Sequence, residues 1–337
     1  MPSPSESTEQ PATYTLTLQE VADGPPILAD YPHWVEPLQT DRRFLAPPLV
    51  DDANGTVLVR AWRYWYNVRG IVETENRLDA RATAAVMVHP WGLDDDHGLP
   101  TPEPAGIAFL CTPEKNRIGL EHVREVVDPF LARIRGDVRL VAYSMPGVED
   151  PIRRRLYASI GTEPDQLRPE DGERLLAERY AAHAFGGKPL VRELALDPRF
   201  PVRDFMAQTP STDAGDRYNG PGYWDLPMPV SSGIQRAAAD RVFYDGEGYP
   251  KVRDYLLSQG IRHILLLGYC TDMCVIRTTC GWENLIQDFN VFLVGDATLA
   301  TFPASTTPRF ATQVALVNSA LQVMVTQVSW VRAEALR

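Results

Sequence analysis

Two repeating patterns of hydrophobic and polar residues divide the chain from residue 82 onward. Strand-like apolar runs cover 82–89, 137–144, 241–244, 261–267 and 290–294. Amphipathic segments, in which apolar residues recur at helical spacing, cover 118–134, 169–184, 249–259, 272–287 and 308–328. Because strands and helices alternate, the pattern predicts an α/β fold of right-handed βαβ units, with a parallel sheet flanked by helices on both faces.

The first 80 residues have a different pattern. Residues 1–12 are rich in Ser, Pro and Glu and are expected to be disordered. Residues 13–18 alternate between polar and apolar side chains, and residues 56–66 are a long aromatic strand candidate. We expect residues 13–80 to form a β-rich extension that packs on the main domain, with its aromatic side chains in the core or at an interface.

The remaining composition is that of an ordinary globular protein of 337 residues, with 44% hydrophobic and 23% charged residues. We expect the main domain to span 81–330, with a long polar, Pro- and Gly-rich insertion at about 147–235. The net charge of −11 offers no basic field for nucleic acid. No signal peptide and no apolar run of about 18 residues is found, so we expect a cytoplasmic protein without membrane contact.

The cysteines suggest a reactive site rather than a structural one. The four stand at positions 111, 270, 274 and 280, in spacings that match neither a zinc ribbon nor a disulfide framework. Cys274 lies near the start of the helix expected after strand 261–267, where the helix dipole and the first N–H groups favour a thiolate. The other three cysteines are expected to pack in the core.

A second candidate lies at the end of strand 82–89, since ligands in such sheets bind beyond the carboxyl ends of the strands. That strand ends at His89, and the acidic run Asp94-Asp95-Asp96-His97 follows. Asp and His side chains suit zinc or iron. A solvated acidic loop explains the run as well, and we expect no metal and no other cofactor.

The motif Gly268-x-x-Thr271-x-x-Cys274-Val275-x-x-Thr278, followed by residues 290–297, resembles the signature of the isochorismatase-like cysteine hydrolases. This family includes nicotinamidases, carbamoyl-amide hydrolases and ureidoacrylate-type amidases. The resemblance implies a Rossmann-like three-layer fold, a homo-oligomer, and catalysis by an Asp, a Lys and a nucleophilic Cys. Cys274 matches the nucleophile, and the N–H groups of Met273 and Cys274 would hold the oxyanion.

Two of the three family positions differ in this chain. His89 stands where the family has its Asp, and Arg241 stands at the Lys position when no gap is allowed. A small gap would place Tyr244 or Asp245 there instead. His89 can accept the thiol proton, and a carboxylate of Asp94, Asp95, Asp96 or Asp245 would orient it. Arg241 would stabilise the thiolate or anchor an acidic substrate.

We therefore expect a hydrolase of a small amide or related carbonyl compound, with a thioester on Cys274 and His89 as the base. The residues expected to contact the small-molecule substrate are Trp91, Tyr269, Cys270, Thr271 and Met273. One alternative is a non-catalytic ligand-binding protein of the same fold, because two catalytic positions have changed. The other is a vinyl ether hydrolase of the isochorismatase type, which works without covalent catalysis.

Overall fold

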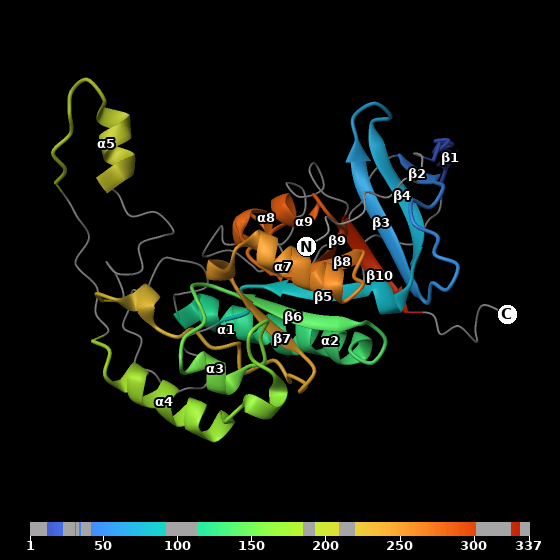
Figure 1. Ribbon diagram of the computed structural model, residues 1–337. Helices are drawn as coiled ribbons and strands as arrows, with labels where there is room; N and C mark the ends of the chain where they lie inside the picture. The colour runs from blue at the N-terminus through green and yellow to red at the C-terminus, as the bar shows by residue number, and fades with distance from the viewer. Residues whose placement is uncertain are drawn as a thin grey trace.

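The computed structural model describes residues 12–22, 31, 34, 42–91, 113–184, 193–208, 220–300 and 325–330. The strands form one continuous ten-stranded sheet in the order β1-β2-β4-β3-β10-β9-β8-β5-β6-β7 (Figure 1). Five neighbouring strands, β9 to β7 in this order, are parallel throughout. The α/β fold with a parallel sheet between helices, expected from the sequence, is confirmed.

The parallel strands coincide with the apolar runs of the sequence. Every residue of β5, β6 and β8 is buried, because helices cover both faces of this part of the sheet. The strands are β5 (Thr83–Val88), β6 (Leu140–Met145), β7 (Arg241–Tyr244), β8 (His263–Tyr269) and β9 (Asn290–Leu299). Their carboxyl ends meet at one edge, where His89 follows β5 and Asp245 follows β7.

Helices α1 (Pro113–His122) and α2 (Asp128–Ile134) connect β5 to β6, joined by the π-helical turn η2 (Val123–Val127). They cover one face of the sheet, while α7 (Tyr249–Ser258) covers the other together with two short helices (Figure 1). The short helices are α8 (Cys274–Arg277) and α9 (Trp282–Leu285).

The single helix predicted over 272–287 is therefore wrong. The chain leaves helical geometry at Thr278, whose φ and ψ are −116° and −177°. It folds tightly enough at Gly281 that a Cβ there would lie 2.6 Å from the backbone nitrogen of Thr278. Helical periodicity continued through this break, so the pattern alone did not reveal it.

Between β6 and β7 the chain forms the helices α3 (Arg153–Leu156), α4 (Pro169–Ala181) and α5 (Pro201–Gln208). The 3-10 turns η3 (Pro164–Gln166) and η4 (Tyr223–Asp225) lie in the same segment. Figure 1 shows α4 beside α3, farther from the sheet than α3 is, and α5 standing away from both. None of the described helices is long and apolar enough to span a membrane.

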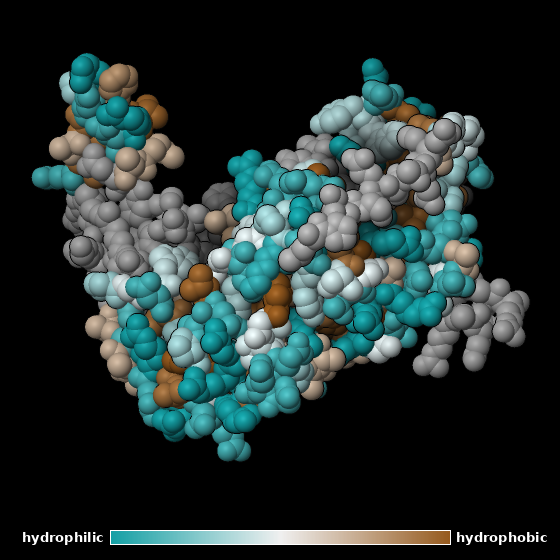
Figure 2. Space-filling view, in the orientation of Figure 1, coloured by the Kyte–Doolittle hydropathy of each residue, from teal (hydrophilic) through white to brown (hydrophobic). Residues whose placement is uncertain are grey.

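The N-terminal extension enlarges the main sheet rather than covering it. It contributes β1 (Gln19–Glu20), β2 (Arg43–Ala46), β3 (Val57–Trp65) and β4 (Gly70–Leu78). Strand β10 (Val325–Trp330) pairs with β3 in antiparallel fashion and with β9 in parallel, and so joins the two parts. Figure 2 shows apolar side chains at the surface of this extension and of α5.

Two predicted elements at the ends of the chain are corrected. Residues 325–328, expected as the end of a helix, belong to β10, whose residues 325–330 pair one by one with Trp62 to Val57 of β3. Residues 13–18, expected as a strand, have no regular structure, and Tyr14 and Leu16 are 42% and 44% exposed. Residues 1–11 and 308–324 lie outside the described part of the chain.

Candidate active site

His89 and Asp245 form the centre of the candidate site. Nε2 of His89 donates a hydrogen bond to Oδ2 of Asp245 at 2.8 Å. The backbone N–H of His89 donates to the carbonyl of Ser144, which extends the pairing of β5 with β6 by one residue. His89 has a φ of 47°, which is rare for a non-glycine residue, and the residue as a whole is only 7% exposed. The strand end thus turns the imidazole toward the carboxylate.

Local contacts hold Asp245 in place. It begins the 3-10 turn η5 (Asp245–Glu247), in which the Glu247 carboxylate accepts from the backbone N–H of Tyr244 at 3.0 Å. The hydroxyl of Thr279 donates to the Asp245 carbonyl at 2.8 Å and ties the turn to the α8–α9 connection. The second carboxylate oxygen, Oδ1, is buried and has no hydrogen-bond partner among the described residues.

Cys274 completes the group. It is the first residue of α8 and is half-buried, and its thiol is close enough to the imidazole of His89 to interact with it electrostatically. Burial alone would lower the pKa of His89, but its hydrogen bonds and charge interactions with Asp245 and Cys274 raise that pKa to about 9. The imidazole is therefore protonated at neutral pH, and a protonated imidazole beside the sulfur stabilises negative charge on it.

The turn that carries Cys274 begins at a glycine that no other residue could replace without strain. Gly268 has a φ of 110°, and a Cβ at this position would lie 2.2 Å from the carbonyl oxygen of Val88. Val88 directly precedes His89, so this close approach brings the cysteine turn against the histidine strand. The peptide bond between Tyr269 and Cys270 is cis.

The same turn is tied to β9. The hydroxyl of Thr298 donates to the Gly268 carbonyl at 2.6 Å, and the hydroxyls of Thr271 and Thr298 are hydrogen-bonded to each other. The N–H of Thr271 also donates to the Leu299 carbonyl at 3.0 Å. These bonds explain why threonine occurs in the motif: its side chain satisfies polar groups at a buried strand end.

One of the two N–H groups expected to hold the oxyanion, that of Met273, already has a hydrogen-bond partner within the turn. The N–H of Met273 donates to the carbonyl of Cys270 at 3.0 Å, and the N–H of Val275 donates to the same carbonyl at 3.2 Å. Among the described residues, no acceptor lies within hydrogen-bonding reach of the Cys274 N–H. The Met273 N–H is thus already bonded within the turn, and the Cys274 N–H is the one expected to bind a substrate oxygen.

The structure does not bring Arg241 to this site. Arg241 is the first residue of β7, at the amino end of the strand, where its guanidinium pairs with Glu163 at 3.2 Å. Asp245, one of the residues that a small gap would place at the Lys position, follows the carboxyl end of the same strand. Asp94, Asp95, Asp96 and His97 lie outside the described residues.

The residues expected to contact substrate fall into two groups. Tyr269, Cys270 and Thr271 are at most 1% exposed and build the turn itself. Met273 is half-buried beside Cys274, and Trp91, 5% exposed, lies two residues after His89. The Trp91 ring meets the Trp224 ring edge to face, with centroids 6.1 Å apart. As substrate contacts, all five stay predictions.

The described cysteines differ in exposure. Cys270 and Cys280 are fully buried, and burial raises the pKa of the Cys280 thiol to about 12, which keeps it protonated. Cys274 is the half-buried one of the three. Cys111 lies outside the described residues. Chemistry at a thiol in this part of the chain is therefore expected at Cys274.

His122 is a further buried histidine next to the site, and sequence analysis did not identify it. Its ring nitrogens bond the Tyr269 hydroxyl and the Asp296 carbonyl, at 2.7 and 2.8 Å. The only sequence signal is a histidine within an apolar helical segment, which is too common to indicate a function.

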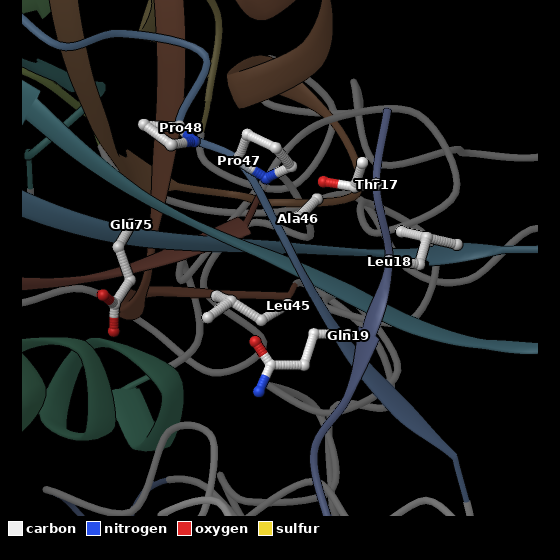
Figure 3. Close-up of a pocket in the computed structure, with 8 residues that line it drawn as sticks. All are labelled: Thr17, Leu18, Gln19, Leu45, Ala46, Pro47, Pro48 and Glu75. Carbon is white, nitrogen blue, oxygen red and sulfur yellow. The ribbon is translucent and has the colours of Figure 1, made fainter. Parts of the chain in front are cut away.

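A separate hollow of about 610 Å3 lies on the extension, between β1 and β2 (Figure 3). Its lining residues are Thr17, Leu18, Gln19, Leu45, Ala46, Pro47, Pro48 and Glu75. None of them is a nucleophile paired with a base, so the hollow does not compete with the His89 group as a catalytic site. No cluster of three or more potential metal ligands occurs in the described part of the chain.

Comparison with known protein families finds a match over the part of the chain that contains the cysteine turn. Residues 224–325 match the family model of the isochorismatase domain. No curated protein matches the chain. One similar solved structure is a cysteine hydrolase from Pseudomonas syringae pv. phaseolicola 1448A, with 11% identity, a TM-score of 0.35, and coverage of 74% of this chain and 89% of that chain.

Two further solved structures are similar at the same level. PnC1 from L. infantum in complex with nicotinate has 12% identity and a TM-score of 0.36, covering 77% of this chain and 96% of that chain. An isochorismatase from Pseudomonas putida KT2440 has 10% identity and a TM-score of 0.35, covering 74% and 88%. Similarities this low carry no information on substrate.

Proposed function

Because the chain carries a domain of the isochorismatase-like superfamily, we propose that it hydrolyses a small amide or related carbonyl compound through a thioester on Cys274. The match over residues 224–325 contains the cysteine turn and confirms the resemblance seen in the sequence. The observation that supports the proposal is that His89 hydrogen-bonds Asp245 and interacts electrostatically with the thiol of Cys274. This is the arrangement of a Cys–His–Asp hydrolase.

Acylation follows from the positions of the three side chains. The Cys274 sulfur, having given its proton to His89, attacks the substrate carbonyl and forms a C–S bond. The Cys274 N–H stabilises the oxygen that becomes negative. His89 then donates its proton to the leaving nitrogen as the C–N bond breaks, which releases an amine and leaves a thioester.

Deacylation uses the same histidine in reverse. His89, now neutral, accepts a proton from a water molecule as the water oxygen attacks the thioester carbonyl. The C–S bond breaks, the carboxylic acid product leaves, and the thiolate and imidazolium pair is restored. Asp245 does not touch the reacting atoms. It is a positioning residue that accepts from Nε2, which leaves Nδ1 for the sulfur.

This chain would thus reverse the charges of its family's catalytic pair. A histidine replaces the family Asp, and a carboxylate, Asp245, replaces the family Lys. One histidine can both accept and donate a proton near neutral pH, so the exchange preserves the acid and base functions. The contact with the thiol favours covalent chemistry over the vinyl ether alternative, in which a cysteine has no part.

Acyl transfer from p-nitrophenyl acetate tests this proposal. We expect a burst of nitrophenol of about one equivalent per chain, with acetyl located on Cys274 by peptide mass spectrometry. Cys274→Ala should abolish the burst, and His89→Ala should slow it by about a hundredfold or more. Cys280→Ser is the matched control and should keep the burst. Acetylation spread over several residues, or unchanged in His89→Ala, would contradict the proposal.

A further inference from the structure

His122 is a fully buried titratable group near the site that the mechanism above does not use. Its side chain is inaccessible to solvent. It ends α1 and hydrogen-bonds one residue of β8 and one of β9, and its ring is edge-on to Trp34 at a centroid distance of 4.9 Å. Trp34 comes from the N-terminal segment and donates its indole N–H to Glu125 at 2.7 Å. Four parts of the chain therefore meet at this histidine.

The hydrogen bonds of His122 define its tautomer. A carbonyl oxygen can only accept, so Nε2 carries the proton that bonds the Asp296 carbonyl at 2.8 Å. Nδ1 is then the acceptor for the Tyr269 hydroxyl at 2.7 Å. Burial, opposed in part by the hydrogen bond to Asp296, lowers the pKa of His122 to about 4, so the ring is neutral at physiological pH.

Tyr269 connects this histidine to the nucleophile. It is the last residue of β8 and directly precedes Cys270. The Cys270 carbonyl accepts the N–H groups of Met273 and Val275, which flank Cys274 on both sides. Tyr269 and the Cys270 carbonyl thus form a connection from His122 to the residues on either side of the nucleophile.

We propose that His122 is a positioning residue for the nucleophile: through Tyr269 and the Cys270 carbonyl, it holds Cys274 at the distance from His89 that the proton transfer requires. The inference rests on the proposed function of Cys274 and His89. Thr298, on β9, also holds the turn, through the Thr271 hydroxyl and the Gly268 carbonyl.

Alkylation of Cys274 by iodoacetamide tests this inference in the full-length protein. The ratio of the rate at pH 6 to the rate at pH 9.5 measures assistance to thiol ionisation and cancels changes in accessibility. We expect His122→Phe and Tyr269→Phe each to lower this ratio by about tenfold. The double variant should be no lower than either single variant, because all three lack the same hydrogen bond.

Two further variants separate positioning from simple stabilisation. His122→Asn keeps an amide oxygen near the position of Nδ1 and should restore the ratio to within about twofold of the parent. His263→Gln is the matched control. His263 is an equally buried histidine at the amino end of β8, the strand that Tyr269 ends, and it bonds Asp52 at 2.9 Å. Its loss should lower the melting temperature and leave the ratio unchanged.

The outcomes distinguish this inference from the proposed function. If His122→Phe and Tyr269→Phe lower only the melting temperature and leave the ratio unchanged, as His263→Gln does, the positioning role is wrong. If His89→Ala leaves the rate ratio unchanged while His122→Phe lowers it, His89 is not the base. The role of His122 in positioning Cys274 is then still supported. Should His122→Phe fail to fold, Tyr269→Phe and His122→Asn still give the answer.

Discussion

Nε2 of His89 and Oδ2 of Asp245 lie 2.8 Å apart, although 156 residues separate them in the chain. They meet because each directly follows a parallel strand, β5 or β7, and the carboxyl ends of parallel strands meet at one edge of a sheet. A histidine between a carboxylate and a thiol has its tautomer, orientation and charge set by those partners.

Asp245→Asn should weaken the base without removing it. The amide cannot balance the imidazolium charge, so the pKa of His89 should fall from about 9 toward its ordinary value near 6.5. Alkylation of Cys274 at pH 7 should slow by up to about tenfold for each unit by which the pKa of His89 falls. Asp254→Asn, on the exposed face of α7, is the control and should have no effect. Equal rates in both variants would remove Asp245 from the site.

Protein stability should fall at alkaline pH because of His89. Its pKa is raised in the folded state, so the stabilisation is fully present below about pH 6.5 and is lost as the pH rises toward 9. The loss should approach about 3 kcal/mol, at 1.36 kcal/mol per pKa unit. Urea unfolding of the parent and of His89→Gln measures it. The two curves of unfolding free energy should converge between pH 6.5 and 9, and parallel curves would contradict the assignment.

His122 should give the opposite dependence. Its pKa is lowered to about 4 in the folded state, so the unfolded chain binds the proton more tightly. Stability should therefore be complete above about pH 6.5 and should decrease as the pH falls toward 4. Urea unfolding of the parent and of His122→Asn at a series of pH values measures this decrease in the free energy of unfolding. A parent that loses no more stability than the variant over that range would show that His122 is not a neutral, buried acceptor.

Gly268→Ala should destabilise the fold strongly. A methyl group there meets the Val88 carbonyl oxygen at 2.2 Å and would also occupy a backbone with φ of 110°. The expected loss of unfolding free energy is about 3 kcal/mol or more. Gly260→Ala is a matched control, because its φ is 76° but no atom lies within 4 Å of the added Cβ. It should cost only about 1–2 kcal/mol. Chemical denaturation of both variants compares the two losses.

The sequence revealed the parts of the fold that are buried on both faces. The strands that became β5 and β8 are continuous apolar runs, which helices on both sides require. Strand β4 was missed because its charged residues, Glu73, Glu75 and Arg77, interrupt any apolar pattern. Glu73 is nevertheless buried, since Arg43 and Arg60 pair with it from the neighbouring strands. Such pairing is visible only once the strands are placed.

The site was predictable only in part, for a related reason. His89 and Cys274 were found because His89 directly follows a clear strand and Cys274 begins the helix after another, where α/β proteins place their chemistry. Ungapped counting chose Arg241, but the four-residue length of β7 places Asp245 at the useful end. His122 could not be found, because its partners Tyr269 and Asp296 are 147 and 174 residues away in the chain.

The pH dependence of Cys274 alkylation tests most directly whether the thiol is activated by His89. The second-order rate of modification by iodoacetamide should be measured between pH 5 and 9.5, with peptide mapping to separate Cys274 from Cys270 and Cys280. We expect fast, selective modification of Cys274 that persists below pH 7, and a loss of that low-pH reactivity in His89→Ala. A rate that rises with an inflection near 8.5, as for an ordinary thiol, and that is the same in His89→Ala would contradict the proposed mechanism.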